Sequence, residues 1–305
     1  APGTEWQLSG GHAQKAEYLS NAANEVKRFK ATITWNPSSQ INDVVLSFAA
    51  NDAYTTNGYY NTNMLYKSVS KDEDGNESHS FTNSLGQTIL ARRINIKETG
   101  TIENLDTYYV YDDFGNLSFV IPPKAAGIST NAEIQPVLSS LCYVYIYDKY
   151  NRLAEKKLPG KGMEYFVYDK QNRQVLRQDP NLRSLVNNFG KPGWMFTKYD
   201  SFGRVVYTGF FANTATRTAM QTALNNMSAN ANNNETVSIS PFTQNNINVY
   251  YTKDAFPTGS MTVLSVNYYD EYPQGAPQLP DQIQNQPILA STPTVITSNG
   301  VSSIR

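Results

Sequence analysis

Cysteine is nearly absent from this chain of 305 residues, because Cys142 is the only one. A single cysteine cannot form an intramolecular disulfide, so cysteine use argues neither for nor against secretion. Histidine is almost as scarce, and His12 and His79 lie in polar surroundings without a carboxylate or nucleophile at a catalytic interval. No apolar run approaches the roughly 20 residues that span a bilayer. The net charge of −1 gives no reason to expect a nucleic-acid partner or an anionic membrane.

The sequence motifs of common catalytic sites are missing as well. There is no phosphate-binding loop, no zinc-ligand spacing and no nucleophile elbow. Cys142 stands between Leu141 and Tyr143 where a strand is expected to start, and a buried thiol is the ordinary role of such a residue. We therefore expect a protein that is not an enzyme and has neither catalytic residues nor a cofactor.

Tyrosine is abundant, and it occurs in a repeated pattern. The chain has 21 Tyr and 13 Phe, with a mean hydropathy of −0.49, which fits an extracellular β protein with amphipathic aromatic faces. The pattern is an aromatic strand followed by Asp and, three residues later, by Gly or Asn. The copies are Tyr111-Asp112-Asp113-Phe114-Gly115-Asn116, Tyr147-Asp148-Lys149-Tyr150-Asn151-Arg152, Tyr168-Asp169-Lys170-Gln171-Asn172-Arg173 and Tyr199-Asp200-Ser201-Phe202-Gly203-Arg204, with a degenerate copy at Thr82-Asn83-Ser84-Leu85-Gly86-Gln87.

Each position of this signature has a physical reason. Gly and Asn tolerate positive φ, so the slot three residues after the Asp predicts a left-handed position in a tight turn. The short Asp side chain can accept hydrogen bonds from backbone amides of the same turn. The residues before the turn, such as Tyr143–Tyr147, alternate with the period of a strand, and a second strand follows it. The signature predicts a β-hairpin.

Five hairpins in series predict a mainly β fold of antiparallel hairpins that forms a wound or shell-like sheet. We expect an N-terminal β cap over 1–64, the array over 65–273 and a linker-like tail over 274–305 that leads to a further region. Insertions interrupt the array at 122–141, 179–192 and 211–261. The last contains apolar residues at helical spacing, which predicts a short helix over 214–227. A sixth signature without its glycine lies at 265–273.

Two other interpretations of the acidic residues remain open. Asp72, Asp74 and Asn76 place oxygen ligands around Gly75 as a calcium loop would, although the twelfth position, Asn83, is not the usual Glu. A further hairpin turn explains the same residues. The repeated Asp residues could be paired carboxylates of a glycosidase, but one Asp per hairpin places them along one edge instead of across a cleft.

The run Tyr-Asp-x-x-Gly-Arg after alternating aromatics resembles the Rhs (rearrangement hotspot) or YD-repeat family over roughly 65–273. Similar stretches occur in large secreted or surface proteins of Gram-negative anaerobes. The resemblance implies stacked hairpins that, in longer relatives, close into a shell around a C-terminal toxin. This chain differs from that pattern because it has too few repeats to enclose anything and lacks the Rhs core box and a cargo domain.

Residues and resemblance together favour a non-enzymatic structural or interaction module of a large bacterial protein, either secreted or at the cell surface. Its expected partner is the remainder of its own longer polypeptide. The alternative is a carbohydrate-binding adhesion module in which exposed tyrosines contact glycans or another cell surface. The two differ in whether the tyrosines of the strands are accessible or packed between hairpins.

Overall fold

The computed structural model describes residues 14–228, 230–244, 246–269, 271–273, 282–284, 286–287, 294–297 and 300–303. The chain divides into two compact units, Ala1–Met163 and Glu164–Arg305. Both are built mainly from antiparallel strands in chain order, which confirms the predicted fold class. The division into cap, array and tail stays a prediction. No helix in the described ranges is long and apolar enough to cross a membrane.

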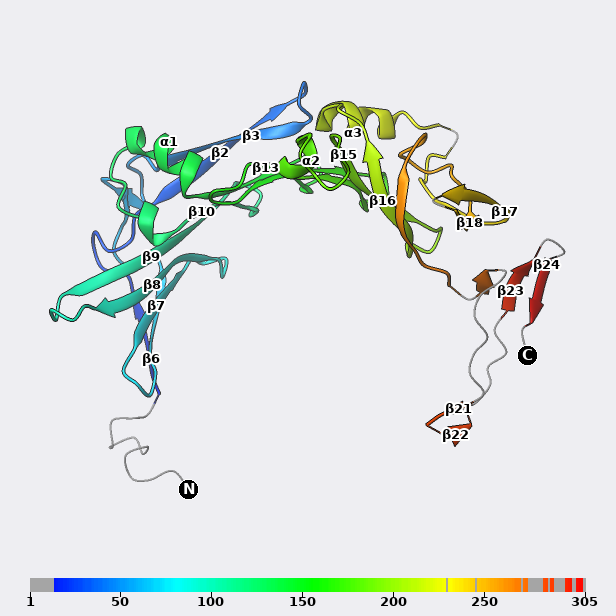
Figure 1. Cartoon of the computed structure of the whole chain (residues 1–305). Coiled ribbons are helices and arrows are strands. Elements are labelled where there is room, and N and C mark those ends of the chain that lie inside the picture. Colours follow the sequence, from blue (N-terminus) through cyan, green and yellow to red (C-terminus); the bar gives the residue numbers. More distant parts are fainter. Residues whose placement is uncertain are drawn as a thin grey trace. The chain divides into compact units, whose positions relative to one another are not determined.

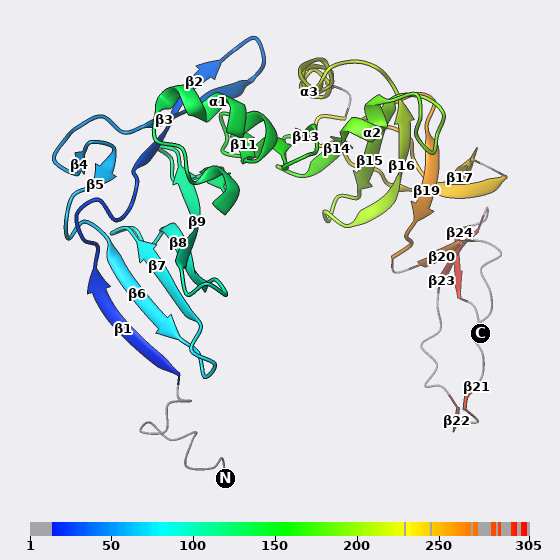
Figure 2. The same ribbon diagram turned by 60° about the vertical axis from the view of Figure 1, so that its left-hand side comes forward.

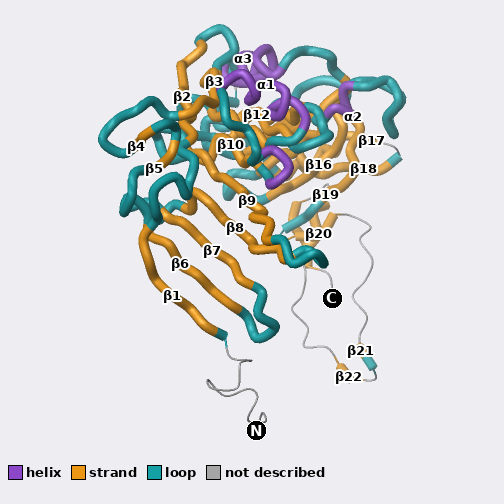
Figure 3. The backbone as a smooth tube through the Cα atoms, turned by 90° about the vertical axis from the view of Figure 1, so that its left-hand side faces the viewer, coloured by secondary structure: helices purple, strands orange, loops and turns teal. Residues whose placement is uncertain are grey.

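The first unit contains a meander of eight strands (Figures 1 and 3). In spatial order they are β1 (Lys15–Ser20), β6 (Tyr66–Lys71), β7 (Glu77–Thr82), β8 (Thr88–Ile96), β9 (Ile102–Tyr111), β10 (Leu117–Ile121), β11 (Tyr143–Tyr147) and β12 (Leu153–Lys157). Every neighbouring pair is antiparallel. Strand β1 therefore lies along the edge of β6 and extends the sheet of the repeats.

A second layer covers part of this sheet (Figure 2). It contains the hairpin of β2 (Phe29–Asn36) and β3 (Ile41–Phe48), the small hairpin of β4 (Thr55–Thr56) and β5 (Tyr59–Tyr60), the 3-10 turn η2 (Pro123–Ala125) and helix α1 (Asn131–Ser140). The Phe29 ring meets the Tyr108 ring of β9 edge-on at 5.2 Å, and both side chains belong to the buried core. Helix α1 begins with a capping box of Thr130 and Glu133.

The second unit contains a meander of five strands. These are β13 (Met163–Tyr168), β14 (Gln174–Gln178), β15 (Gly193–Tyr199), β16 (Val205–Ala212) and β19 (Thr262–Val266). Around them lie α2 (Pro180–Arg183), α3 (Arg217–Asn225) and the hairpin of β17 (Val237–Gln244) and β18 (Ile247–Tyr251). The remaining strands are β20 (Glu271–Pro273), β21 (Gln282–Ile283), β22 (Gln286–Pro287), β23 (Thr294–Thr297) and β24 (Gly300–Ser303). Trp194 and Phe196 are fully buried in the core of this unit.

Helix α3 confirms the helix predicted over 214–227. Its Thr216 cap side chain accepts from the Ala219 amide, and Met220 and Leu224 bury its apolar face. The Gln221 side chain fixes the helix to strand β13, because it donates to the Tyr168 carbonyl at 2.7 Å and accepts from the Tyr168 amide at 3.1 Å. The predicted insertion at 211–261 begins later than expected, since β16 extends to Ala212.

The strand order places all signature turns of a unit at the same edge of its sheet. In an antiparallel meander successive turns alternate between the two edges. The turns at 83–87, 112–116 and 148–152 follow β7, β9 and β11, so they share one edge. The same holds for 169–173 and 200–204 in the second unit. We call this side of each sheet the signature edge.

A β-bulge accompanies every signature turn. The register shifts by one residue at each of them, and the extra residue stands six positions after the Asp or Asn that opens the turn. These residues are Ile89, Ser118, Ala154, Val175 and Val206, and all are buried. The turns at 72–76 and 97–101, on the opposite edge, have no such shift. Because a bulge adds local twist and turns two successive side chains the same way, it buries a pair such as Val206 and Tyr207.

Candidate functional site

The turn after β15 shows how the signature residues act together. The Gly203 amide donates to the Asp200 carbonyl at 3.1 Å, and the Asp200 amide donates to the Arg204 carbonyl at 3.0 Å. Oδ1 of Asp200 accepts from the Phe202 and Arg204 amides, both at 2.9 Å. Oδ2 pairs with Nε of Arg204 at 2.7 Å. One carboxylate therefore binds both the backbone of the turn and the side chain that follows it.

The other signature turns repeat this geometry. Oδ1 of Asp112, Asp148 and Asp169 accepts from the amides two and four residues later, and Oδ2 from the side chains of Asn116, Arg152 and Arg173. The amide oxygen of Asn83 also accepts from the amides two and four residues later, but its Nδ2 donates to the Gln87 side chain, at 2.7 Å. The left-handed slots have φ of 77° at Gly86, 81° at Gly115, 58° at Asn151, 62° at Asn172 and 79° at Gly203. These are the positive values that Gly and Asn tolerate.

The calcium candidate has the same turn. Oδ1 of Asp72 accepts from the amides of Asp74 and Asn76, and its Oδ2 accepts from the Asn76 side chain at 2.9 Å. Gly75 has a φ of 85°. Both carboxylate oxygens of Asp72 are therefore engaged in the turn, and no group of three or more His, Cys, Asp or Glu side chains that could hold a metal occurs in the described part of the chain. These contacts favour the hairpin interpretation of the residues.

One turn forms with neither Asp nor Asn at its first position. In the turn at 97–101 the Gly100 amide donates to the Lys97 carbonyl at 2.8 Å, and the Lys97 amide donates to the Thr101 carbonyl at 3.0 Å. Gly100 has a φ of 79°, as the signature glycines do. The backbone turn thus needs only a left-handed residue. The Asp adds three hydrogen bonds and orients the side chain four positions later.

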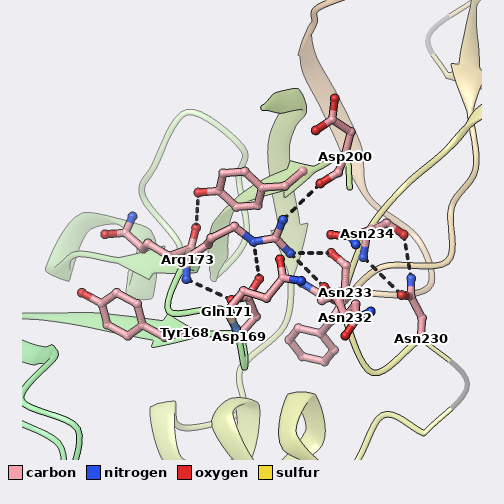
Figure 4. Close-up of polar contacts among 12 residues, drawn as sticks. Tyr168, Asp169, Gln171, Arg173, Asp200, Asn230, Asn232, Asn233 and Asn234 are labelled. Atoms are coloured by element: carbon pink, nitrogen blue, oxygen red, sulfur yellow. Dashed lines mark hydrogen bonds and ion pairs between the residues drawn. The ribbon is translucent and has the colours of Figure 1, made fainter. Parts of the chain in front are cut away.

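That fourth side chain reaches the next hairpin along the signature edge. Gln87 donates to the Gly115 carbonyl at 3.4 Å, and Asn116 donates to Oδ1 of Asn151 at 3.2 Å. In the second unit Nη1 of Arg173 donates to the Asp200 carbonyl at 3.1 Å (Figure 4). All three contacts run in the same direction, from one turn to the turn of the following hairpin. We call these side chains the bridging residues.

The signature tyrosine makes the return contact. The Tyr147 hydroxyl donates to the Leu117 carbonyl at 2.9 Å, and the Tyr199 hydroxyl donates to the Gln174 carbonyl at 2.8 Å. Both carbonyls belong to the residue five positions after the Asp of the preceding hairpin. Tyr269 does the same to the Val205 carbonyl at 3.0 Å, so it takes the place of the tyrosine of the degenerate sixth signature. Asp270 of that signature lies outside the described residues.

Arginine and tyrosine also stack across this contact. The guanidinium of Arg173 lies 4.7 Å from the centre of the Tyr199 ring, and that of Arg204 lies 4.5 Å from the Tyr269 ring. A cation over an aromatic face is favourable by about 0.5–2 kcal/mol, depending on how far it is desolvated. Each Arg therefore pairs with the carboxylate of its own turn and with the ring of the next hairpin.

The ionisation of these groups reflects the same arrangement. Burial raises the pKa of the Tyr147 hydroxyl to about 12, and the charge of Asp112 on the preceding hairpin adds to the rise. Burial also raises the pKa of Tyr199, with Asp169 contributing, and that of Tyr111, beside Tyr109. Burial opposes ionisation of Asp200, but the hydrogen bonds from Arg204 and from the turn amides outweigh it and lower the pKa of that carboxyl.

The signature tyrosines at the ends of the strands are neither fully exposed nor fully buried. Tyr111, Tyr147, Tyr168 and Tyr199 are all half-buried. The exposed aromatic of the signature is the turn tip two residues after the Asp, and Phe202 is 82% exposed there. The strand tyrosines thus contribute to contacts between hairpins, and the tips point to solvent.

The second unit contains a buried ion pair that the sequence did not reveal. Nζ of Lys198 and Oε1 of Glu235 are 2.8 Å apart, and both side chains are fully buried. Glu235 also accepts from the Tyr207 and Thr252 hydroxyls and from the Asp254 and Ala255 amides. Burial lowers the pKa of Lys198, although Glu235 opposes that shift. The pair joins β15 to the insertion, with every bond inside the protein, so it acts as a structural anchor.

Of the other side chains considered for chemistry, the structure describes Cys142 and His79. Cys142 is fully buried, and burial raises the pKa of its thiol to about 11, which keeps it protonated and unreactive at neutral pH. His79 contacts Glu77 at 2.6 Å. His12 lies outside the described residues. The structure does not bring the two described candidates, Cys142 and His79, together with the signature aspartates.

Replacing Gly203 by Val should destabilise the protein by about 1–3 kcal/mol, because a β-branched residue would be forced to positive φ. Phe202→Val should cost less than about 0.5 kcal/mol, since that side chain is exposed. Gly203→Asn is the matched control and should be nearly neutral, because Asn occupies the same slot at 151 and 172. Urea unfolding measures all three. Equal costs for the two valine variants would contradict the left-handed slot.

Asp200→Asn should lower stability at pH 7 by about 0.5–1.5 kcal/mol, since the charged bond to Arg204 is lost and the amide bonds can persist. The folded pKa of Asp200 is lowered, so its contribution is present above the unfolded pKa of about 3.9 and is lost as the pH falls through the folded value. The gap between the wild type and the variant should therefore shrink below about pH 4. A gap that does not change with pH would contradict a role for the carboxylate charge.

No family model matches the chain, and no curated protein matches it either. Several solved structures do resemble it. A crystal structure of TcdB2-TccC3-Cdc42 has a TM-score of 0.37 and 10% identity over 63% of this chain and 12% of the matched chain. A crystal structure of TcdB2-TccC3 has the same TM-score with 11% identity, over 65% and 12%. The Photorhabdus luminescens Tc holotoxin pore, with the mutation TccC3-D651A, also has 0.37 with 10% identity, over 68% and 13%.

The chain thus spans about an eighth of the length of the chains it matches. Similarity at this TM-score carries no argument about what the protein does.

Proposed function

We propose that this chain is a structural module whose task is to hold a row of hairpins in fixed register. The observation that carries the proposal is the chain of contacts along the signature edge. Each bridging residue is positioned by its own turn and donates to the next one, as Asn116 does to Asn151. Arrays in which each repeat contacts its neighbours gain stability from these interfaces, and their usual role is to form an extended surface or wall.

We propose that the chain has no catalytic role. A carboxylate that acts as an acid, base or nucleophile must be able to contact its substrate. In Asp112, Asp148 and Asp200 both oxygens already accept hydrogen bonds from their own turn. These groups stand one per hairpin along an edge, which supports a role in turn formation.

We further propose that the module belongs to a large secreted or cell-surface bacterial protein of the Rhs or YD-repeat type. The support is the signature itself, in which the Tyr, Asp, Gly or Asn, and Arg positions each have a distinct contact. In such a protein, for example one of a polymorphic toxin system, the chain would form part of a shell wall or scaffold. Its partner would be the rest of the same polypeptide.

Carbohydrate-mediated adhesion is the second candidate. The half-buried strand tyrosines do not favour it, because they bond to neighbouring hairpins. Exposed tyrosines do occur before the first signature, at Tyr18, Tyr54 and Tyr66. If the chain binds carbohydrate, these tyrosines are better placed to contact it than the strand tyrosines of the repeats.

An antibody against the purified chain tests the structural role in the source bacterium. We expect an immunoblot band far above 34.1 kDa, found in the medium or on cells and digested when protease is added to intact cells. Lysed cells and a cytoplasmic marker protein provide the controls. A band of about the size of this chain that is found only inside cells would contradict the proposal.

A further inference from the structure

Two adjoining cavities open in the first unit, between the β4–β5 hairpin and the signature edge. The larger has a volume of about 510 Å³ and the smaller about 360 Å³. Both are lined by Arg28, Tyr60 and Asn83, so these residues lie where the cavities meet. Volumes in this range are typical of sites for small ligands. The turn contacts described above do not account for either cavity.

The larger cavity has an unusual lining. Tyr54, Tyr60 and Tyr66 contribute three aromatic rings, and Asn63 and Asn83 contribute two amides. Ser20 and Ser84 add hydroxyl groups. Arg28 is the only charged residue among the lining residues of this cavity. The chemistry of the cavity is therefore one cation, several aromatic faces and several neutral donors and acceptors.

Arg28 is held in place by its neighbours. Its Nη1 donates to both carboxylate oxygens of Asp52, at 2.9 and 2.8 Å, and to the Thr55 hydroxyl. The guanidinium lies 5.6 Å from the centre of the Tyr54 ring and 5.5 Å from that of Tyr60. The hydrogen bonds to Asp52 and Thr55 use one of the three nitrogens of the Arg28 guanidinium. The donors on Nε and Nη2 can serve other partners, among them the Tyr60 hydroxyl beside them and a ligand in the cavity.

Each part of this lining suits a different part of one kind of ligand. A fixed guanidinium binds a carboxylate with paired, charge-assisted hydrogen bonds. Tyrosine rings offer apolar faces and hydroxyls, on which the C–H face of a sugar can pack. The Asn63 amide and the Ser84 hydroxyl can hydrogen-bond to sugar hydroxyls. The Asn83 amide is already engaged within its own turn. A neutral saccharide would offer no carboxylate to Arg28, and a nucleotide phosphate would bring a second negative charge for which the lining of this cavity has no second cation.

We propose that the cavity around Arg28 binds an acidic saccharide, with the carboxylate at Arg28 and a sugar ring against Tyr66. Tyr66 is 69% exposed on strand β6 and would lose that exposure to the ligand. The proposal does not depend on the structural role of the repeats, because Arg28 and Tyr66, which would contact the ligand, make none of the bridging contacts along the signature edge. It would allow the same chain to contact a negatively charged polysaccharide.

Isothermal titration calorimetry with the whole chain tests this site. The probes are oligogalacturonate, oligoguluronate and sialyllactose, each beside its uncharged counterpart of equal length. At least one acidic probe should bind at least about tenfold more tightly than its counterpart, the gain of one charge-assisted contact. Binding should also weaken as salt is added. Equal affinity for charged and neutral probes, or no binding by any of them, would overturn the proposal.

Matched variants locate the site. Tyr66→Ala should weaken binding roughly tenfold or more, and Tyr18→Ala should leave it within about twofold. Tyr18 is the control because it is 83% exposed on the neighbouring strand β1 but does not line the cavity. Arg28→Lys should keep some affinity but lose the preference for the acidic probe, since Lys lacks the planar fork. Circular dichroism checks that the variants fold. Equal losses in both tyrosine variants would overturn the location.

Discussion

A carboxylate that accepts two backbone amides and one side chain closes the signature turns, and the other features of the repeat follow from it. In the turn of Asp200 the same group fixes the loop and aims Arg204. The turn at 97–101 shows that the backbone can turn without such a group, although it then lacks a side chain with this constraint. The left-handed slot therefore makes the turn possible, and the Asp makes it specific.

The side chains that the turns hold in place also connect neighbouring hairpins along the sheet. Gln87, Asn116 and Arg173 each reach the following turn, and the signature tyrosines reach back to the preceding hairpin. The bulge beside each turn buries one further residue, which is Ser118 beside the turn at 112–116 and apolar beside the other four signature turns. Local turn chemistry, register and core packing thus favour the same arrangement, as expected of a sequence that specifies one fold.

Much of the fold could be predicted from the sequence, because its signals are local. Alternating aromatics and the Gly or Asn slot predicted the hairpins, and helical spacing predicted α3. The bulges also leave a signal, since consecutive apolar pairs such as Val175 and Leu176 interrupt the alternation, but it was not used. A similar signal, Thr130 with Glu133, marks the start of helix α1 in a segment treated only as an insertion.

Contacts between segments that are distant in the sequence could not be predicted from local sequence patterns. Glu235 lies in an Asn-rich stretch whose composition predicts a solvent-exposed loop. In the structure it is buried and contacts Lys198, which lies 37 residues earlier in the chain. Nothing in the periodicity of either segment indicates that they meet. The cavity at Arg28 is of the same kind, because it joins the β4–β5 region to a repeat turn at Asn83. Such sites depend on which loops the topology brings together.

The most direct test of coupling between hairpins is a double-mutant cycle of Arg173→Ala and Tyr199→Leu, measured by urea unfolding. The two residues belong to successive hairpins, and their side chains stack. A coupling energy of about 0.5–2 kcal/mol is expected, with a value near zero for the control cycle of Arg173→Ala and Phe202→Ala. Strictly additive effects of Arg173 and Tyr199 would contradict the account, because the hairpins would then lie side by side without stabilising one another.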